Sequence, residues 1–92
     1  MGYDWPDWAL DHLHGIEPWE VMQVLTGKNP RWPRRGKSRN GIPILTIWGR
    51  TAAGRVLVIG VYQVTTWQWN VTSARDMTTA ERAEFEQWEE SR

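Results

Sequence analysis

The chain contains no cysteine. Disulfide-stapled scaffolds and metal sites built from thiolates are therefore excluded. It also lacks an apolar run of the ~18–20 residues that a helix needs to cross a bilayer. Its first residues, MGYDWPDW, have neither the basic nor the apolar segment of a secretory signal peptide. These absences predict a cytoplasmic protein that does not enter a membrane.

Familiar catalytic motifs are missing as well. The sequence has no glycine-rich phosphate loop, no Gly-x-Ser-x-Gly and no His-Glu-x-x-His. Its two histidines, His12 and His14, would lie ~200° apart on a helix, so they cannot chelate one metal ion together. We therefore expect neither a cofactor nor a metal site.

Acidic residues are absent from one long segment. Residues 28–75 hold nine basic residues and no acid, although the net charge of the chain is zero. Residues 1–27 carry five acids and no base, and residues 76–92 carry six acids and two bases. Two interpretations stay open: the basic middle binds an anionic ligand, or acidic helices lie over a basic sheet and neutralise it.

Tryptophan is abundant, with eight residues in a chain of 92. A chain of this length forms one domain, 1–92, and buries only roughly 60–65% of its unfolded surface. Tryptophan helps such a small core, because each side chain can bury ~150–250 Å². We expect most of the tryptophans to be buried, Trp8 and Trp48 among them.

Residues 42–75 predict an antiparallel sheet. Three runs rich in Val, Ile, Thr and Trp are separated by two short breaks, which is typical of adjacent strands. The runs are 44–49, 55–62 and 66–72. The first break ends at Gly54, which can adopt a positive φ, whereas the second, at 63–65, has no glycine. Residues 2–4 are a candidate for a further, very short strand.

Residues 1–27 predict a helical hairpin. The first helix is expected over 5–14, with Asp4 as its N-cap. The second is expected over 17–26, because Glu-Pro opens it and a glycine follows its end. Few residues separate the two helices, so we expect them to pack against each other.

Residues 76–92 predict a C-terminal helix. Thr78 and Glu81 have the spacing of a capping box, in which each side chain bonds a backbone amide of the first turn. The predicted class is therefore α+β: a helical hairpin packed on a three- to four-stranded, mostly antiparallel sheet, with a C-terminal helix.

Residues 28–41, KNPRWPRRGKSRNG, connect the hairpin to the sheet. Prolines and turn-forming residues predict an irregular surface loop. Six of its fourteen residues are basic, so it is either a solvated connection or a phosphate-binding loop whose tryptophan stacks on a base. The candidate RNA-binding residues are Arg31, Trp32, Arg34, Arg35, Lys37, Arg39 and, on the sheet, Arg55.

The candidate catalytic residues are His14, Arg50 and Arg75. On the predicted helix, His14 shares a face with Asp11 and lies at the C-terminus, where the helix dipole favours the imidazolium. A carboxylate beside a histidine suits a general base, although a surface histidine at a helix end fits the same pattern. Arg50 and Arg75 flank the strands, and arginine holds phosphate through a planar, bidentate fork.

These motifs together resemble the BrnT family of bacterial toxins, over nearly the whole chain. After the aromatic lead-in Tyr3-Asp4-Trp5, the matching pieces are His14-Gly15-Ile16-Glu17, Val21, Leu25, Trp48-Gly49-Arg50-Thr51, Gly54-Arg55-Val56 and Thr72-Ser73-Ala74-Arg75. The chain departs from the family pattern at Leu13 and at Asp76, where members commonly carry basic residues. Both departures remove positive charge.

The resemblance implies a RelE-like fold and a metal-independent endoribonuclease, the toxin of a toxin–antitoxin pair. In such a reaction the ribose 2′-hydroxyl attacks the adjacent phosphate, and the protein positions the RNA and stabilises the developing charge. His14 would transfer a proton, while Arg50 and Arg75 would hold the phosphate. The implied partners are RNA and a cognate antitoxin, in a homo- or hetero-oligomer. The alternative is a non-catalytic module of the same fold that binds nucleic acid or a protein.

Overall fold

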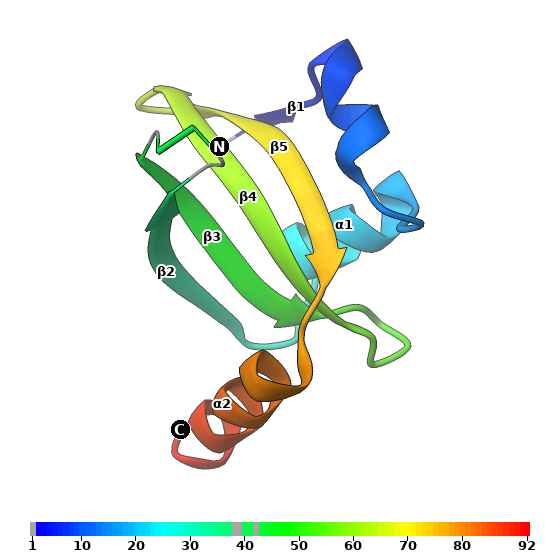
Figure 1. Cartoon of the computed structure of the whole chain (residues 1–92), viewed down its shortest axis with the longest axis vertical. Coiled ribbons are helices and arrows are strands. Elements are labelled where there is room, and N and C mark those ends of the chain that lie inside the picture. Colours follow the sequence, from blue (N-terminus) through cyan, green and yellow to red (C-terminus); the bar gives the residue numbers. More distant parts are fainter. Residues whose placement is uncertain (1, 38–39, 42) are drawn as a thin grey trace.

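The computed structural model describes residues 2–37, 40–41 and 43–92. Its class is α+β, as predicted, with a mixed sheet between an N-terminal helical segment and a C-terminal helix (Figure 1). The elements are β1 (Gly2–Asp4), the 3₁₀ helix η1 (Asp7–His12), α1 (Pro18–Thr26), β2 (Arg31–Lys37), β3 (Pro43–Arg50), β4 (Val56–Thr65), β5 (Gln68–Asp76) and α2 (Thr79–Glu90).

The sheet has five strands among the described residues, in the order β1-β5-β4-β3-β2. Strands β2 to β5 pair antiparallel with their neighbours, and the short β1 pairs in parallel with β5. The turn from β3 to β4 ends at Gly54, whose φ is +94°, as the glycine suggested. Strands β4 and β5 are joined by Thr66 and Trp67, slightly later in the chain than the predicted break at 63–65.

The segment 28–41 is not the irregular loop that its composition predicted, because seven of its residues form β2. Strand β2 lies at the edge of the sheet and has a neighbour on one side only. The missing amide hydrogen of Pro33 is therefore tolerated, as it is in edge strands generally. Proline together with Lys and Arg also discourages further strands from adding to this edge. The fifth strand of the sheet comes from this segment.

The first helical segment also differs from the prediction. It is a six-residue 3₁₀ helix rather than an α-helix over 5–14. Asp4 cannot cap it, because Asp4 belongs to β1 and pairs with Asn70 of β5; the N-cap position is taken by Pro6. Helix η1 buries only Ala9 of its own residues, and Trp8 is 53% exposed instead of lying in the core.

The two α-helices agree with the sequence patterns. Helix α1 follows Glu17, which forms a capping box with Glu20, and it ends before Gly27. Helix α2 begins with the predicted capping box between Thr78 and Glu81. Each helix therefore starts where its own sequence satisfies the free backbone amides of the first turn.

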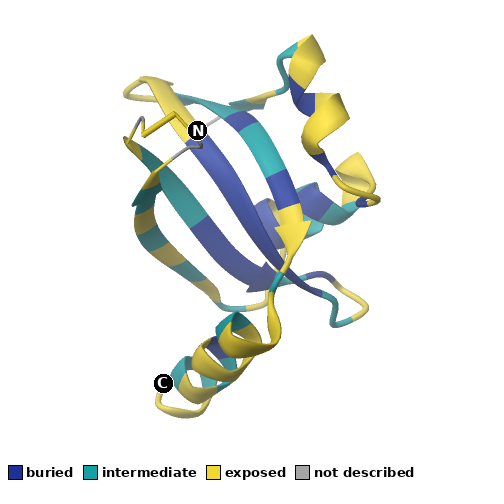
Figure 2. Cartoon of the chain, in the orientation of Figure 1, coloured by how far each residue is buried: buried dark blue, intermediate teal, exposed yellow. Residues whose placement is uncertain are grey.

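Each face of the sheet has its own core. The face that packs against η1 and α1, here the α1 face, holds the larger cluster, which consists of Leu13, Ile16, Val21, Val24, Leu25, Ile47, Leu57, Ile59, Val61, Val71 and Ala74. The opposite face, the α2 face, packs against α2 through Trp48, Val56, Val58 and Phe85. Figure 2 shows the buried residues concentrated along the middle of the sheet, whereas much of η1 and α2 is exposed.

Candidate functional site

Three arginines from different strands converge on helix α2. Arg34 comes from β2, Arg50 from the end of β3 and Arg75 from β5, and each guanidinium contacts carboxylates of the same helix. The pairs are Arg34 Nη1–Glu84 Oε1 (2.7 Å), Arg50 Nε–Glu89 Oε2 (3.0 Å), Arg50 Nη2–Glu86 Oε2 (3.4 Å) and Arg75 Nη2–Glu81 Oε2 (2.7 Å). The basic strands and the acidic helix thus neutralise each other on this face.

Arg50 is the least accessible of the three, with 22% of its side chain exposed. Its guanidinium also donates to the carbonyl oxygen of Gly54 at 3.0 Å and lies 5.8 Å from the centre of the Phe85 ring. The hydrogen bonds that Arg50 donates to Glu89 raise the pKa of Arg50, although partial burial opposes this shift. These contacts tie α2 to the turn between β3 and β4, which is a structural role for Arg50.

Arg75 and Arg34 are more accessible, with 46% and 35% of their side chains exposed. Arg75 holds both carboxylate oxygens of Glu81 and, with the hydrogen bonds from Thr78, lowers the pKa of Glu81 to about 2. Glu81 therefore has two tasks, since it also completes the capping box of α2. The Arg34 guanidinium is covered on one side by Trp32 and Trp48, at 4.5 and 4.7 Å from the ring centres.

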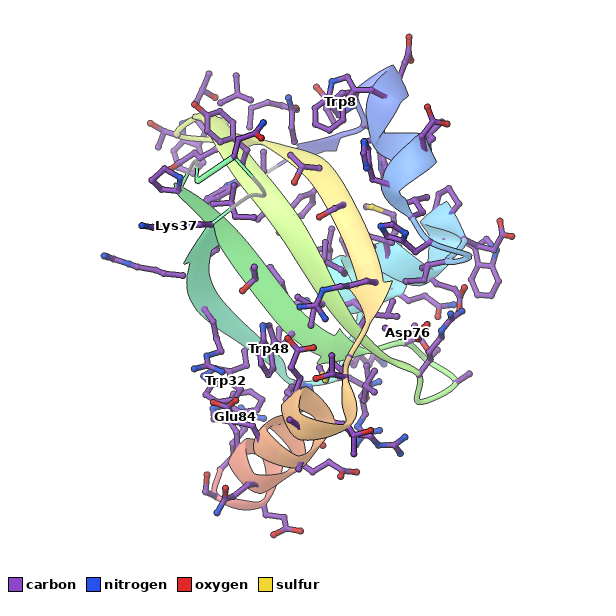
Figure 3. All side chains as sticks on the ribbon, viewed as in Figure 1. Trp8, Trp32, Lys37, Trp48, Asp76 and Glu84 are labelled. Carbon is purple, nitrogen blue, oxygen red and sulfur yellow. The ribbon has the colours of Figure 1, made fainter. Side chains whose placement is uncertain are left out.

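Trp32, the candidate base-stacking residue, is already stacked. Its ring lies parallel to that of Trp88 in α2, with 5.2 Å between ring centres and 2° between planes. Its other aromatic neighbour is Trp48, which it meets edge-on at 5.6 Å. Figure 3 shows Trp32, Trp48 and Glu84 together where α2 meets the sheet. The aromatic and cationic groups expected for RNA binding thus form one cluster with α2 packed against it. The cluster consists of Trp32, Trp48, Arg34, Arg50 and Arg75.

Next to this cluster, the α2 face continues as a strip of small residues. Arg34 is in register with Thr46, Gly60 and Ser73 across four strands. A Cβ atom at Gly60 would lie 2.7 Å from Ser73 Oγ, so only glycine keeps the centre of the strip at this level. Figure 1 shows α2 beside one end of the sheet and no helix in front of the other end of these strands. Arg34 and Arg75 are three strand spacings, about 14 Å, apart across the sheet, and Arg75 lies two residues along β5 from Ser73, which is level with Arg34.

Arg55 lies at a different corner and ties three segments together. Its Nε donates to Asp76 at 2.8 Å, and its Nη1 contacts Glu20 of α1 at 3.2 Å. The hydrogen bonds that Arg55 donates to Asp76 lower the pKa of Asp76 and raise the pKa of Arg55. Asp76, one of the departures from the BrnT pattern, is thus the structural partner of Arg55.

The remaining cations of β2 lie on the α1 face. Arg31 donates to the carbonyl oxygens of Leu25 and Gly27, at 2.7 and 3.3 Å, where it satisfies the C-terminal end of α1. Arg35 is opposite Leu45, and neither Arg35 nor Lys37 forms an ion pair with any described residue. In Figure 3, Lys37 points away from the sheet edge. Arg39 lies outside the described residues.

His14 is not brought to the arginines. It follows η1 in a turn, with a φ of +50°, so it does not share a helix face with Asp11. Its neighbours Leu13 and Ile16 belong to the core of the α1 face, whereas Arg50 and Arg75 contact α2 on the opposite face. The three candidate catalytic residues therefore do not form one constellation.

No protein-family model matches the chain, and no curated protein matches it. The described part of the chain contains no helix that is both long and apolar enough to cross a membrane. Within residues 2–37, 40–41 and 43–92, no three His, Asp or Glu side chains are grouped as metal ligands would be.

Sequence reasoning missed the glutamates of α2 as part of the site. The signal that could have found them is the charge pattern, because residues 76–92 hold six acids directly after the basic segment. Of the two interpretations of that pattern, the ion pairs favour internal neutralisation for Arg34, Arg50, Arg55 and Arg75. They leave Arg35 and Lys37, on the α1 face, without a described acidic partner.

Proposed function

We propose that the cluster on the α2 face binds RNA, and that the protein is a metal-independent endoribonuclease of RelE-like fold, the toxin of a bacterial toxin–antitoxin pair. One observation carries the proposal: three arginines from separate strands take all their carboxylate partners from one helix. A phosphate offers guanidinium groups the same bidentate oxygens as a carboxylate. Helix α2 thus fills positions that suit phosphates of one RNA strand.

The exposed pairs are the ones that RNA would displace. An ion pair at the surface is worth ~0.2–1 kcal/mol, so exchanging a glutamate for a phosphate on Arg34 or Arg75 costs little. The Arg50–Glu89 pair is less accessible, with about a fifth of each side chain exposed, 22% and 21%. RNA would therefore lie along the strip from Arg34 to Arg75, while Arg50 keeps α2 in place beside it.

In this arrangement Arg75 takes the central chemical role. An arginine held at a strand end can orient the phosphate for attack by the 2′-hydroxyl and stabilise the charge that develops on it. Arg34 would hold another phosphate farther along the strand, and the small residues of the strip leave room for the nucleotides between them. The antitoxin derives from the BrnT resemblance, and the cytoplasmic location belongs to the same proposal.

The decisive experiment compares Arg75→Ala with Arg82→Ala. Arg82 is the matched control, since it is an arginine of α2 with 56% of its side chain exposed, and its only ion pair with a described residue is within the helix, to Glu86. Purified protein would be mixed with a long single-stranded RNA in excess chelator and cleavage followed on a gel. We expect the wild type and Arg82→Ala to cut the RNA, and Arg75→Ala to be inactive and no longer toxic in bacterial cells. Arg75→Lys should rescue poorly, because lysine lacks the bidentate fork.

A second candidate function is a non-catalytic RNA- or protein-binding module. The observation that favours it is the position of His14, which leaves no histidine beside Arg75 to transfer a proton. If the wild type binds RNA but neither cuts it nor inhibits growth, the module is the correct function. If Arg75→Ala binds RNA as tightly as Arg82→Ala, the α2 face is not the RNA site in either case.

A further inference from the structure

Three polar side chains form a row across the α2 face, at the end of the strands that lies away from α2. Tyr62 of β4 is in register with Asn70 of β5, and Asn70 is in register with Asp4 of β1. Tyr62 follows Val61, which belongs to the core of the α1 face, so the side chain of Tyr62 points to the α2 face. Residues in register share a face of the sheet, so Asn70 and Asp4 point the same way. We call these three residues the polar row.

The polar row is accessible and has no described partner. Tyr62 is 47% exposed, Asp4 is exposed and Asn70 is partly buried. No polar atom of these side chains forms a hydrogen bond or an ion pair with a described residue. Helix α2 does not cover the row, because it lies beside the other end of the strands (Figure 1). The polar row is therefore accessible to a ligand.

The composition of the row is unusual for a sheet. Asparagine and aspartate are depleted from strands, because their side chains compete for backbone hydrogen bonds. Here the two residue types lie opposite each other, Asn70 in β5 and Asp4 in β1. Departures from local preference of this kind are expected at functional sites. A binding role explains a pair that sheet formation does not.

The polar row lies next to the strip on which we place the RNA backbone. Tyr62 is two residues along β4 from Gly60, the centre of the strip, so the row and the strip are about 7 Å apart. Arg34 and Arg75 attract phosphates, whereas the carboxylate of Asp4 repels them. An RNA strand whose phosphates are held by the arginines therefore orients its bases toward the polar row.

The chemistry of the row matches guanine. A carboxylate only accepts hydrogen bonds, and Asp4 offers two acceptor oxygens. Guanine is the RNA base whose Watson–Crick edge presents two adjacent donors, N1–H and the 2-amino group. Adenine and cytosine present a ring nitrogen that repels a carboxylate, and uracil presents a single donor. Beside the donors of guanine is O6, which can accept from the Asn70 amide. The Tyr62 ring supplies a surface on which the base can stack.

We propose that the polar row is a guanine-binding site, through which the protein selects single-stranded RNA that contains guanine. Tyr62 stacks on the base, Asp4 accepts from N1–H and the 2-amino group, and Asn70 donates to O6. The inference rests on the RNA-binding part of the proposed function and adds base selection to it. It does not require cleavage, so it applies equally to the non-catalytic module.

The test compares labelled oligouridylates that carry a single central G, A, C or U. All riboses are 2′-O-methylated, because cleavage by 2′-hydroxyl attack is then impossible and only binding is measured. Fluorescence anisotropy at fixed salt gives the dissociation constants. We expect the wild type to bind the guanine oligomer about tenfold more tightly than the other three. Inosine in place of guanine removes the 2-amino group alone and should abolish most of this preference.

Two aspartate variants with the same charge change test the carboxylate. Asp4→Asn should lose most of the preference for guanine over inosine, because an amide cannot accept from both donors. Asp7→Asn makes the same change at an exposed position of η1, outside the polar row, and should keep the preference. Tyr62→Phe retains stacking and should bind as the wild type does, whereas Tyr62→Ala should weaken the guanine oligomer about tenfold.

Three outcomes would overturn the inference. They are equal binding of the four oligomers, tighter binding of a base other than guanine, and equal loss of preference in Asp4→Asn and Asp7→Asn. If the oligomers bind equally but Arg75→Ala weakens them all, the proposed RNA site stands and the guanine site is wrong. If the wild type binds none of them, the proposed RNA binding is itself wrong, and base selection fails with it.

Discussion

Neutralising two glutamates of α2 should strengthen RNA binding. Glu81 and Glu84 are the partners of Arg75 and Arg34, the two exposed arginines of the cluster. In the double variant Glu81→Gln/Glu84→Gln both guanidinium groups lose a charged competitor. The cap of α2 is retained, because glutamine at the third helical position also completes a capping box.

The size of the effect follows from the exposure of the pairs. Each surface ion pair is worth ~0.2–1 kcal/mol, so removing two of them saves an incoming RNA strand ~0.4–2 kcal/mol. Since 1.4 kcal/mol corresponds to a factor of ten, the dissociation constant should fall by about 2- to 30-fold. The assay is fluorescence anisotropy of a labelled single-stranded oligoribonucleotide at fixed salt, because salt alone changes such affinities strongly.

The control must make the same change in net charge. Glu90 and Asp11 are exposed and form no ion pair with a described residue, so Glu90→Gln/Asp11→Asn serves this purpose. If both double variants bind RNA equally, the arginines have only a structural role and the proposed site is wrong. Circular dichroism would verify that α2 is still folded in each variant.

The other predictions concern stability. Trp48 is 7% exposed and Trp8 is 53% exposed, so Trp48→Ala should cost ~3–5 kcal/mol in urea unfolding and Trp8→Ala less than ~1.5 kcal/mol; equal losses would contradict the assignment of the core. Acid should weaken the attachment of α2. The pKa of Glu81 is depressed from 4.5 to about 2, so the stability that its ionised form contributes is present above pH 4.5 and is lost as the pH falls toward 2. In Glu81→Gln, unfolding curves over this range should depend less on pH, and an unchanged dependence would mean that other carboxylates dominate.

The sequence predicted those elements whose boundaries are set locally. The α2 capping box, the end of α1 at Gly27 and the turn at Gly54 depend on a few adjacent residues, and the structure confirms each. Strand β2 depends on a distant neighbour instead. Its Pro and Gly residues indicate a loop when read locally, and only pairing with β3 shows that they stand on an edge strand.

The N-terminal segment was mispredicted for a related reason. Asp4 has the chemistry of an N-cap, but the parallel pairing of β1 with β5 places it in a strand. The helix then starts after Pro6 as a 3₁₀ helix, and Trp8 lies on its exposed side. His14 consequently lies in a turn, and the face it was expected to share with Asp11 does not exist.

The candidate site could be predicted only in part. The sequence singled out Arg34, Arg50 and Arg75, and the structure places all three around α2. The sequence could not show which acid each arginine contacts, because an ion pair between two elements depends on how those elements pack in space. The charge map left ligand binding and internal neutralisation open. The answer differs between faces: the arginines of the α2 face are neutralised, and Arg35 and Lys37 of the α1 face are not.

Internal neutralisation also restricts the ligands that the α2 face can accept. The glutamates of α2 are tethered, so each competes for its arginine at an effective concentration in the millimolar range. A small anion that contacts one guanidinium gains a single ion pair. To form that pair, it has to displace a carboxylate that is present at this effective concentration. An RNA strand spans Arg34 and Arg75 together. Once one of its phosphates is bound to the first arginine, the contact of another phosphate with the second arginine is also intramolecular. The tethered helix therefore favours polyanions over free phosphate or single nucleotides, and it does so without any contact that recognises a base.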